Sequence, residues 1–524
     1  MTLGEALIRL LEAHGVDTVF GIPGVHTVEL YRGLAGSKIR HVTPRHEQGA
    51  GFMADGYARA SGRPGVAFVI TGPGLTNAIT AMGQARADSI PMLVISGVNA
   101  RDTLGKGFGH LHELPDQIGL IGKVALASHH IATPDELPAA LADAFATFAS
   151  ARPGPVHIEI PLDVMTLPGD GLSAQLANDL PPQPEAGKIA EAAALARKAK
   201  RPLILAGGGA KVAEEPLKRL AEALDAPVVL TANARGLMHG HPLVVPASPS
   251  FKAVRKLMAE ADFVIAVGTE FGPTDYDMYG DNGFVVPENL VRIDIDADQI
   301  ARHPSRLSIQ ADAGTALDAL LGSLAGVELT GDGAWRATVV RDEALAQLSP
   351  EMIQQLAVVE TIRDTLPGSI IVGDSTQPIY AANLYYDHDR PAGWFNAATG
   401  FGTLGYGPPA AIGAALALPD TTVVCISGDG GFQFTLPELG AAKDAGAPVI
   451  FLVWNNRGYR EIETSMTSVG VEPVGVSPAP PDFIKIADAY GIAAERLESV
   501  EGLPDALRRA KAKNAPYLIE IVVD

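Results

Sequence analysis

The hydrophobic residues of this chain fall into short, nearly continuous apolar runs that alternate with longer amphipathic segments. In the first part of the chain, apolar runs of strand length lie at residues 18–20, 65–71, 91–96 and 156–160. Strands that alternate with helix-length segments are typical of a parallel sheet covered by helices. Residues 1–15 carry apolar positions at helical spacing with charges between them, which predicts an amphipathic helix and not a signal peptide.

The same pattern occurs twice more along the chain. Further apolar runs lie at residues 202–206, 228–230, 263–267 and 291–295, and then at 370–372, 423–426, 449–454 and 517–523. A stretch rich in Pro, Gly, Asp and Ser (166–188) and a second stretch of little predicted order (326–351) separate these groups. The sequence therefore predicts an α/β protein with three parallel-sheet, helix-covered domains, at residues 1–165, 189–325 and 351–524.

Candidate chemistry lies at the ends of two neighbouring strands of the third domain. Gly428-Asp429-Gly430-Gly431 follows one apolar run, and Asn455-Asn456-Arg457-Gly458 follows the next. Open α/β sheets bind ligands at the carboxyl ends of their strands. A carboxylate and an amide oxygen are hard donors that suit Mg²⁺, and glycines let backbone N–H groups close on a phosphate. The stretch predicts a metal and diphosphate site.

Composition narrows the class of ligand. The formal net charge is −20, so no basic surface for nucleic acid or for an anionic membrane is expected. No window reaches the roughly 18 apolar residues of a membrane-spanning helix. The single cysteine, Cys425, lies in a predicted core strand, which excludes a disulfide within the chain and fits a cytoplasmic protein. A small-molecule enzyme is expected.

Three further motifs lie in the first domain, ahead of the two motifs of the third. Phe20-Gly21-Ile22-Pro23-Gly24, Arg45-His46-Glu47 and Thr71-Gly72-Pro73-Gly74-Leu75-Thr76-Asn77 precede the two glycine-flanked motifs of the third domain. In this order they resemble the thiamine diphosphate enzymes of the acetolactate synthase, pyruvate oxidase and 2-oxo acid decarboxylase group, along essentially the full chain. The resemblance implies pyrimidine-binding, central and diphosphate-binding domains, in that order.

The resemblance also implies roles for individual residues. Side chains of Asp429 and Asn456, with the Gly458 carbonyl, would hold Mg²⁺. The amides of the glycine run and two hydroxyls would hold the diphosphate, which assigns Gly428, Gly430, Gly431, Ser375 and Thr376. Leu404 would be the apolar wedge that bends the cofactor, and the Gly402 carbonyl would accept from its 4′-amino group. Glu47 would reach the pyrimidine N1′ from the partner subunit and activate the cofactor.

Three residues of the first domain are candidates for the substrate pocket. His26 falls where related lyases place a polar active-site residue, and His112 falls in a loop that lines the same pocket. Either would protonate the reacting carbon or hold the substrate carboxylate, and the alternative for each is a surface or structural histidine. Gln84, in the helix after the glycine turn, is a further candidate.

The central domain bears on the substrate and on a second cofactor. Where acetolactate synthases carry an arginine-containing run, this chain has the carboxylates Glu270, Asp275 and Asp277. This reversal of charge would favour a substrate with a distal cation over pyruvate, and the alternative is a solvated acidic loop. The flavin-binding members have a Gly-Met-His-Gly turn near the place where this chain reads Pro246-Ala247-Ser248-Pro249-Ser250, so FAD is not expected.

The first domain as a whole resembles 2-ketoarginine (5-guanidino-2-oxopentanoate) decarboxylases, and a carboxylate can bind a guanidinium in bidentate fashion. The resulting hypothesis is a non-oxidative decarboxylase of a 2-oxo acid with a cationic side chain, yielding an aldehyde and CO₂. The alternatives are an acetolactate synthase-type carboligase that joins two oxo acids and a catalytically silent member. Because Glu47 and the metal ligands lie on different domains, a homodimer or homotetramer with active sites between subunits is implied.

Overall fold

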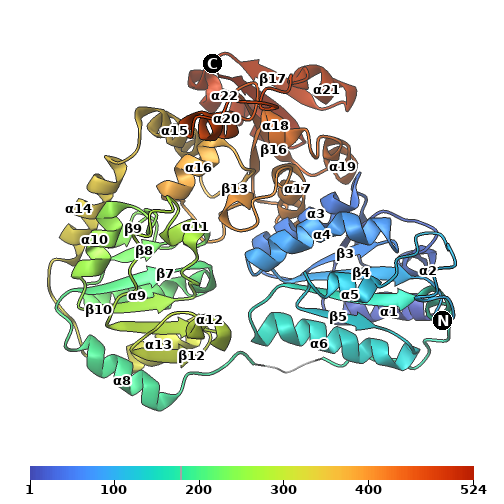
Figure 1. Cartoon of the computed structure of the whole chain (residues 1–524), viewed down its shortest axis with the longest axis horizontal. Coiled ribbons are helices and arrows are strands. Elements are labelled where there is room, and N and C mark those ends of the chain that lie inside the picture. The colour runs from blue at the N-terminus through green and yellow to red at the C-terminus, as the bar shows by residue number, and fades with distance from the viewer. Residues whose placement is uncertain (177–179, 524) are drawn as a thin grey trace. The chain divides into compact units, whose positions relative to one another are not determined.

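The computed structural model describes residues 1–176 and 180–523 (Figure 1). Its strands form three six-stranded sheets in succession along the chain. The prediction of three parallel-sheet, helix-covered domains is confirmed.

The first sheet has the strand order β2-β1-β3-β4-β6-β5, and all its pairs are parallel. Helices cover it, and the first of them begins with a capping box in which Thr2 and Glu5 exchange hydrogen bonds. Its strands are β1 (Thr18–Gly21), β2 (Arg40–Val42), β3 (Gly65–Val69), β4 (Met92–Val98), β5 (Ala127–His130) and β6 (Pro155–Pro161). Its helices are α1 (Leu3–Ala13), α2 (Val28–Arg32), α3 (Glu47–Ser61), α4 (Pro73–Ala87), α5 (Gln117–Ile121), α6 (Leu137–Ser150) and α7 (Leu162–Met165).

The central sheet has the order β12-β11-β10-β7-β8-β9 and is also parallel. Its strands are β7 (Pro202–Ala206), β8 (Val228–Leu230), β9 (Val244–Val245), β10 (Phe263–Val267), β11 (Leu290–Asp294) and β12 (Leu307–Gln310). The helices in this part are α8 (Ala186–Ala196), α9 (Glu214–Leu224), α10 (Lys252–Glu260), α11 (Pro273–Tyr276), α12 (Ala297–Ala301), α13 (Ala313–Ser323), α14 (Gly333–Leu345), α15 (Pro350–Thr365) and α16 (Gln377–Leu384).

The third sheet has the order β14-β13-β15-β16-β18-β17. Its strands are β13 (Ile370–Gly373), β14 (Trp394–Asn396), β15 (Val423–Gly428), β16 (Val449–Asn455), β17 (Ala493–Leu497) and β18 (Tyr517–Val522). Its helices are α17 (Gly407–Ala417), α18 (Asp429–Phe432), α19 (Glu438–Ala445), α20 (Arg460–Ser468), α21 (Phe483–Ala489) and α22 (Leu503–Lys513).

The strands that the hydrophobic pattern predicted are the four inner strands of every sheet, and the strands it missed are the two edge strands of each. Inner strands such as β16 and β10 are buried along their whole length, whereas the edge strands β2 and β17 are largely exposed or half-buried. A strand covered on both faces reads as a continuous apolar run, and an edge strand does not.

The expectation of little order over residues 326–351 was wrong for half of that stretch, because α14 occupies Gly333–Leu345. Its buried side includes Gly333, Arg336, Ala337 and Ala344, which is too small and too polar to produce an apolar stripe. The predicted linker at 166–188 lies partly outside the described residues, and α8 begins within it at Ala186.

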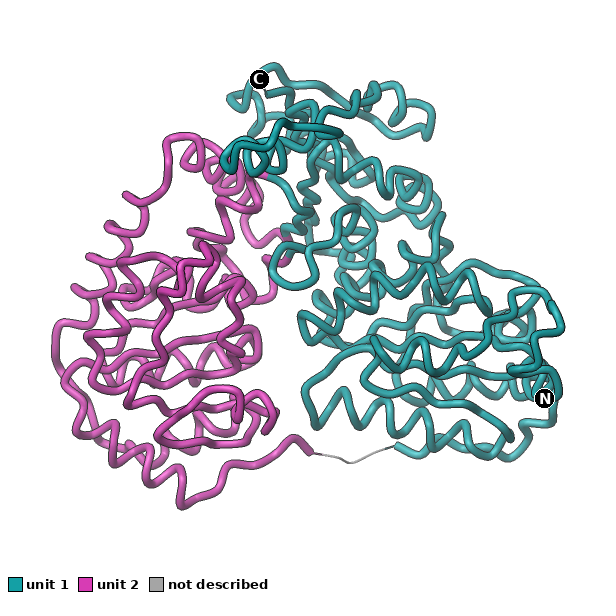
Figure 2. Tube along the Cα trace, in the orientation of Figure 1, with its two compact units in different colours: residues 1–179, 371–376, 396–524 teal, residues 180–370, 377–395 magenta. Residues whose placement is uncertain are grey.

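The described chain divides into two compact units (Figure 2). Of the described residues, one unit comprises 1–176, 371–376 and 396–523, and the other comprises 180–370 and 377–395. The first unit joins the N-terminal and C-terminal parts of the chain through α3 and α17, which lie side by side. Glycines allow this approach, since a Cβ at Gly56 would lie 1.9 Å from the Ala410 carbonyl oxygen and one at Gly413 1.9 Å from that of Met53.

None of the helices in the described part of the chain has the length and the apolar character needed to cross a membrane. Cys425 is a free, buried cysteine.

Candidate functional site

Two neighbouring strands of the third sheet end at the predicted metal and diphosphate motifs. Strands β15 and β16 pair in parallel, with Gly428 opposite Trp454. Asp429 begins α18 immediately after β15, and Asn456 follows β16 directly. The parallel register brings these two polar residues to the same edge of the sheet.

The Asp429 carboxylate faces the turn that follows β16. Burial raises the pKa of this carboxyl group, and hydrogen bonds from the backbone N–H groups of Asn456, Gly458 and Gly430 oppose the shift. The Asp429 carboxylate thus lies beside the backbone of Asn456 and Gly458, whose side-chain amide and carbonyl are the other two donors that the sequence predicts. This donor set, hard and oxygen-rich, fits Mg²⁺.

A buried carboxylate anchors the turn after β16 through hydrogen bonds. Glu520, on β18, accepts a 2.7 Å hydrogen bond from the Asn455 side-chain amide, whose oxygen accepts in turn from the Arg457 N–H at 3.1 Å. Gly458 has a φ of 149°, and a Cβ there would lie 2.5 Å from the Val476 carbonyl oxygen. The turn needs glycine at this position because the chain passes directly over it.

The glycines after β15 leave their backbone close to several predicted cofactor residues. A Cβ at Gly428 would lie 3.0 Å from the Thr376 hydroxyl, and one at Gly431 would lie 3.3 Å from Asp374 and 3.4 Å from Leu404. The predicted phosphate-binding glycines, a predicted phosphate-binding hydroxyl and the predicted wedge thus gather in one place. A Cβ at Gly430 would lie 2.5 Å from the Tyr459 ring, so the close packing here relies on glycine. Backbone N–H groups, a hydroxyl and a carboxylate are the groups that bind a diphosphate and its metal, and in this respect the residues fit thiamine diphosphate.

The loop that carries Leu404 is held by a second buried carboxylate. Asp374 accepts hydrogen bonds from the Gly405 N–H at 2.9 Å, from the Gly407 N–H at 3.3 Å and from the Ser427 hydroxyl at 3.2 Å. Burial raises the pKa of Asp374 to about 6, against the effect of these donors and of the Ser375 N–H. Gly402 lies exposed in the same loop, with a φ of 75°.

Glu47 is the first residue of α3 and is half-buried. Its Oε2 accepts a 3.0 Å hydrogen bond from the Asn77 amide, which lies in α4 beyond the glycine turn. A Cβ at Gly74 would lie 3.5 Å from Glu47 Oε1. Two of the motifs that carried the resemblance therefore meet at this carboxylate.

His26 and His112 lie against each other, with ring centroids 4.9 Å apart and an edge-to-face angle of 65°. Among the described residues, Nδ1 of each ring is buried without a hydrogen-bond partner, and so is the hydroxyl of Thr71. A Cβ at Gly97 would lie 3.0 Å from that hydroxyl and 2.7 Å from the His26 carbonyl oxygen. Burial first, and then the neighbouring His112, lower the pKa of His26. The two histidines thus form a compact polar cluster with the Thr71 hydroxyl nearby.

Gln84 lies apart from this pair, and its side-chain amide is engaged at both ends. Its nitrogen donates to Asp88 at 2.6 Å and its oxygen accepts from the Thr403 hydroxyl at 2.9 Å.

The three carboxylates of the central domain have different surroundings. Asp275 accepts from the Ala232 N–H at 2.9 Å, and its charge lies near that of the buried Arg235. Asp277 forms an ion pair with Arg255 at 3.0 Å. Only Glu270 of the three is exposed. The excess of negative charge expected for this loop is therefore partly balanced by two arginines of the same domain, which lie far from it in sequence.

Sequence reasoning assigned no role to Asp374, Asn77 and Glu438. Asp374 carried a local signal, because it ends the apolar run of β13 and precedes Ser375 and Thr376. Glu438 accepts hydrogen bonds from the backbone N–H groups of Arg45 and His46. The residues next to Glu438 in the sequence give no signal of this contact. In residues 1–176 and 180–523, no group of three or more His, Cys, Asp or Glu side chains could hold a metal ion, so a metal here would rely on the mixed donor set at Asp429.

Family models match three stretches of the chain. The thiamine pyrophosphate enzyme N-terminal TPP binding domain matches residues 1–120, the central domain matches 189–320, and the C-terminal TPP binding domain matches 374–521. Each stretch contains strands of one of the three sheets, and the third includes both glycine-flanked motifs.

Relatives match along almost the full length. The chain is 43% identical to a probable 2-ketoarginine decarboxylase of Pseudomonas aeruginosa, over 99% of this chain and 94% of that protein. It is 33% identical to a probable acetolactate synthase large subunit of Methanocaldococcus jannaschii, over 99% of this chain and 91% of that protein. It is also 33% identical to the acetolactate synthase isozyme 3 large subunit of Escherichia coli, over 99% and 94%. The chain belongs to the thiamine pyrophosphate enzyme family.

Proposed function

We propose that this protein catalyses the non-oxidative decarboxylation of a 2-oxo acid with a cationic side chain, 2-ketoarginine or a close analogue, to an aldehyde and CO₂. One observation carries the proposal: identity to the probable 2-ketoarginine decarboxylase is 43% over nearly the whole of both chains, against 33% for the two acetolactate synthases. The reaction would use thiamine diphosphate and Mg²⁺ and no flavin.

The third domain would hold the cofactor. Asp429, Asn456 and the Gly458 carbonyl would bind Mg²⁺, and the backbone of Gly430 and Gly431 would bind the diphosphate. Further contacts would come from Gly428, Ser375, Thr376, Leu404 and the Gly402 carbonyl. When bound, thiamine diphosphate supplies the carbon nucleophile that attacks a 2-oxo group and the electron sink that permits loss of CO₂.

Glu47 would hold and exchange a proton at the pyrimidine ring. Its hydrogen bond from Asn77 supports this role, because an amide donor fixes the direction of the carboxylate without neutralising it. His26 and His112 would bind the substrate carboxylate and deliver the proton that replaces CO₂, with Thr71 beside them. A histidine whose pKa is lowered by burial is neutral at neutral pH and can act as either donor or acceptor.

The cationic end of the substrate would contact Glu270. Asp275 and Asp277 were candidates for the same task, but their hydrogen bonds and ion pairs with the central domain favour a structural role. Glu270 is the exposed carboxylate of the three, and a carboxylate that a guanidinium can reach from solvent can bind it in bidentate fashion.

The active enzyme would be a homodimer or homotetramer with sites between subunits, located in the cytoplasm. Val25, Phe108 and Leu111 support an assembly, because they flank the two histidines in sequence and are 67, 68 and 60% exposed in the single chain. Exposed apolar residues that gather beside a polar cluster are typical of an interface. We also propose that the three domains are bounded near residues 165, 189, 325 and 351.

CO₂ release with added thiamine diphosphate and Mg²⁺ tests the function on pyruvate, benzoylformate and 2-ketoarginine, with products identified by mass spectrometry. The expected result is an aldehyde from 2-ketoarginine and little turnover of pyruvate. Conversion of pyruvate to acetolactate, with 2-ketoarginine untouched, would establish the carboligase instead. If none of the three oxo acids turns over while the cofactor binds, the protein is a silent member of the family.

A further inference from the structure

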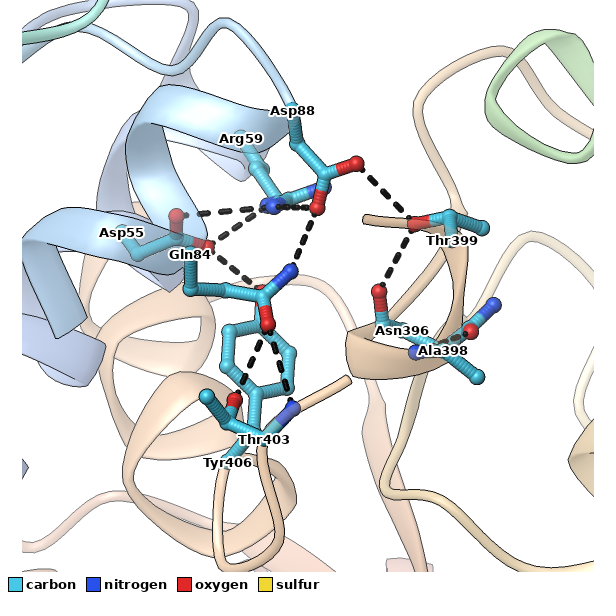
Figure 3. A network of polar contacts seen from close by, with 9 residues as sticks. All are labelled: Asp55, Arg59, Gln84, Asp88, Asn396, Ala398, Thr399, Thr403 and Tyr406. Atoms are coloured by element: carbon cyan, nitrogen blue, oxygen red, sulfur yellow. Dashed lines mark hydrogen bonds and ion pairs between the residues drawn. The ribbon is translucent and has the colours of Figure 1, made fainter. Parts of the chain in front are cut away.

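The loop from Thr399 to Tyr406 carries Gly402 and Leu404, and a buried polar network from the N-terminal domain meets it. Figure 3 shows this network, which joins side chains of α3 and α4 to the loop. Its charged members are Asp55 and Arg59 on α3 and Asp88 at the end of α4, and their side chains are at most 2% exposed.

The network holds two carboxylates for one guanidinium. Arg59 donates to Asp55 at 2.6 Å and to Asp88 at 2.8 Å, so one guanidinium serves two carboxylates. Buried carboxylates need further donors. Tyr406 donates its hydroxyl to Asp55 at 2.5 Å, and Thr399 donates to Asp88 at 3.1 Å. Both of these neutral donors lie at the ends of the Leu404 loop.

Gln84 connects the network to the middle of the loop. Its amide nitrogen donates to Asp88 at 2.6 Å, which directs its oxygen towards Thr403. That oxygen accepts from the Thr403 hydroxyl at 2.9 Å and lies 3.5 Å from the Thr403 N–H. A fully buried side chain that donates at one end and accepts at the other has to be an amide here. A carboxylate would face Asp88, and a hydrocarbon would take one donor from Asp88 and this acceptor from the Thr403 hydroxyl.

The other side of Leu404 is held independently. Asp374 accepts from the Gly405 N–H at 2.9 Å, and the Thr435 hydroxyl donates to the Gly405 carbonyl at 2.8 Å. Residues 403 and 405 are thus bonded to different elements, and the half-buried Leu404 between them lies 3.4 Å from the position of a Cβ at Gly431. The direction of the leucine side chain is set from both sides.

We infer that Gln84 is a positioning residue that holds Thr403, and through it Leu404 and Gly402, in the orientation that bends and binds the organic part of the cofactor. This inference rests on the proposed function, in which the loop contacts thiamine diphosphate. It replaces the substrate contact expected for Gln84. Through Gln84, the N-terminal domain would contribute to cofactor binding within its own compact unit. This contribution is separate from the proton exchange proposed for Glu47.

The test compares two ligands by isothermal titration calorimetry in the presence of Mg²⁺: thiamine diphosphate and inorganic pyrophosphate. In Gln84→Met, which removes both hydrogen bonds at nearly constant volume, the Kd for thiamine diphosphate should rise about tenfold or more. The Kd for pyrophosphate should stay within about twofold, since the glycine run does not contact Gln84. Equal weakening of both ligands, or no weakening of either, would overturn the inference.

Two further variants separate positioning from loss of stability. Thr403→Val keeps the shape of the loop residue and removes only its hydroxyl, and it should reproduce most of the effect. Combined with Gln84→Met it should add little, because both changes break the same hydrogen bond, and additive effects would contradict the mechanism.

Gln299→Met controls for a generally weakened fold. Gln299 lies in the central domain and is 3% exposed, and its replacement should leave both Kd values unchanged. If the wild-type protein binds pyrophosphate but not thiamine diphosphate, the proposed function fails and this inference fails with it.

Discussion

The carboxylate of Glu438 and the backbone N–H of His46 lie 3.1 Å apart, although 392 residues separate them in the chain. The same carboxylate accepts from the Arg45 N–H at 3.0 Å. Glu47 follows directly as the first residue of α3. A glutamate from the C-terminal part of the chain therefore accepts hydrogen bonds from the two residues just before the predicted proton carrier.

This buried carboxylate should make stability depend on pH. Burial raises the pKa of Glu438 from 4.5 to about 7, against the hydrogen bonds from Arg45 and His46. A raised pKa in the folded state means that the stabilising contribution is complete below pH 4.5 and is lost as the pH rises through 7. For Glu438→Gln, we expect urea denaturation between pH 4.5 and 8 to show a smaller decline with pH, by about 3 kcal/mol at most. The exposed Glu501→Gln should follow the wild type, and an unchanged profile in Glu438→Gln would contradict the assignment.

Replacement of Glu47 by glutamine should separate binding from turnover. The amide keeps the size of the side chain and removes its ability to exchange a proton, so turnover should fall by roughly two to four orders of magnitude. Calorimetry should show thiamine diphosphate still bound. Glu215→Gln, an exposed glutamate in the first turn of α9, is the matched control and should be fully active. Near-normal turnover in Glu47→Gln would remove this residue from the chemistry.

The Asp429 carboxylate should determine how cofactor binding depends on the Mg²⁺ concentration. Asp429→Asn removes the only carboxylate of the proposed donor set, so the Mg²⁺ concentration for half-maximal cofactor binding should rise at least about tenfold. Removal of divalent ions with a chelator should abolish activity in the wild type, and Mg²⁺ should restore it. Asp420→Asn, at an exposed aspartate just before β15, should have the wild-type requirement. The same requirement in both variants would place the metal elsewhere.

Asp275 and Glu270 of the central domain should differ in their effects, the first on stability and the second on KM. Asp275 lies near Arg235, whose side chain is 1% exposed and whose pKa burial lowers to about 10, with Asp275 opposing that shift. Asp275→Asn takes away that charge and should lower the free energy of unfolding by about 3 kcal/mol. Glu270 is exposed, so Glu270→Gln should lower stability much less than Asp275→Asn, and it should raise KM for 2-ketoarginine but not for uncharged oxo acids. If Glu270→Gln destabilises the protein as much as Asp275→Asn does, the structural distinction between them is wrong.

The contact between α3 and α17 should tolerate no side chain at Gly413. A Cβ there would lie 1.9 Å from the Met53 carbonyl oxygen, so Gly413→Ala has to separate two packed helices. We expect a loss of about 3 kcal/mol or more in thermal or urea unfolding. Gly322→Ala provides the comparison, since a Cβ at this helical glycine meets nothing within 4 Å and should be neutral or slightly stabilising. Equal behaviour of the two variants would contradict the close packing.

The fold could be predicted from the sequence where burial is complete. Strands such as β10 and β16 are covered on both faces and appear as unbroken apolar runs, so every inner strand was recognisable. Edge strands such as β2 and β17 were missed because they are largely exposed or half-buried, and the buried edge strands β9 and β14 were missed because they are two and three residues long. Helix α14 was missed because it buries small and charged residues that leave no clear period.

The cofactor motifs were also recognisable from the sequence, because their chemistry is local: a glycine run, an aspartate and an asparagine at the ends of parallel strands. Only the tertiary structure decided the partners that these motifs use. Gln84 meets Thr403 across 319 residues and Glu438 meets His46 across 392. A buried polar group takes whichever partner the packed domains bring within hydrogen-bond distance, and no local pattern records that choice. For this reason Gln84 resembled a pocket residue in the sequence, whereas in the structure it supports the loop of Leu404.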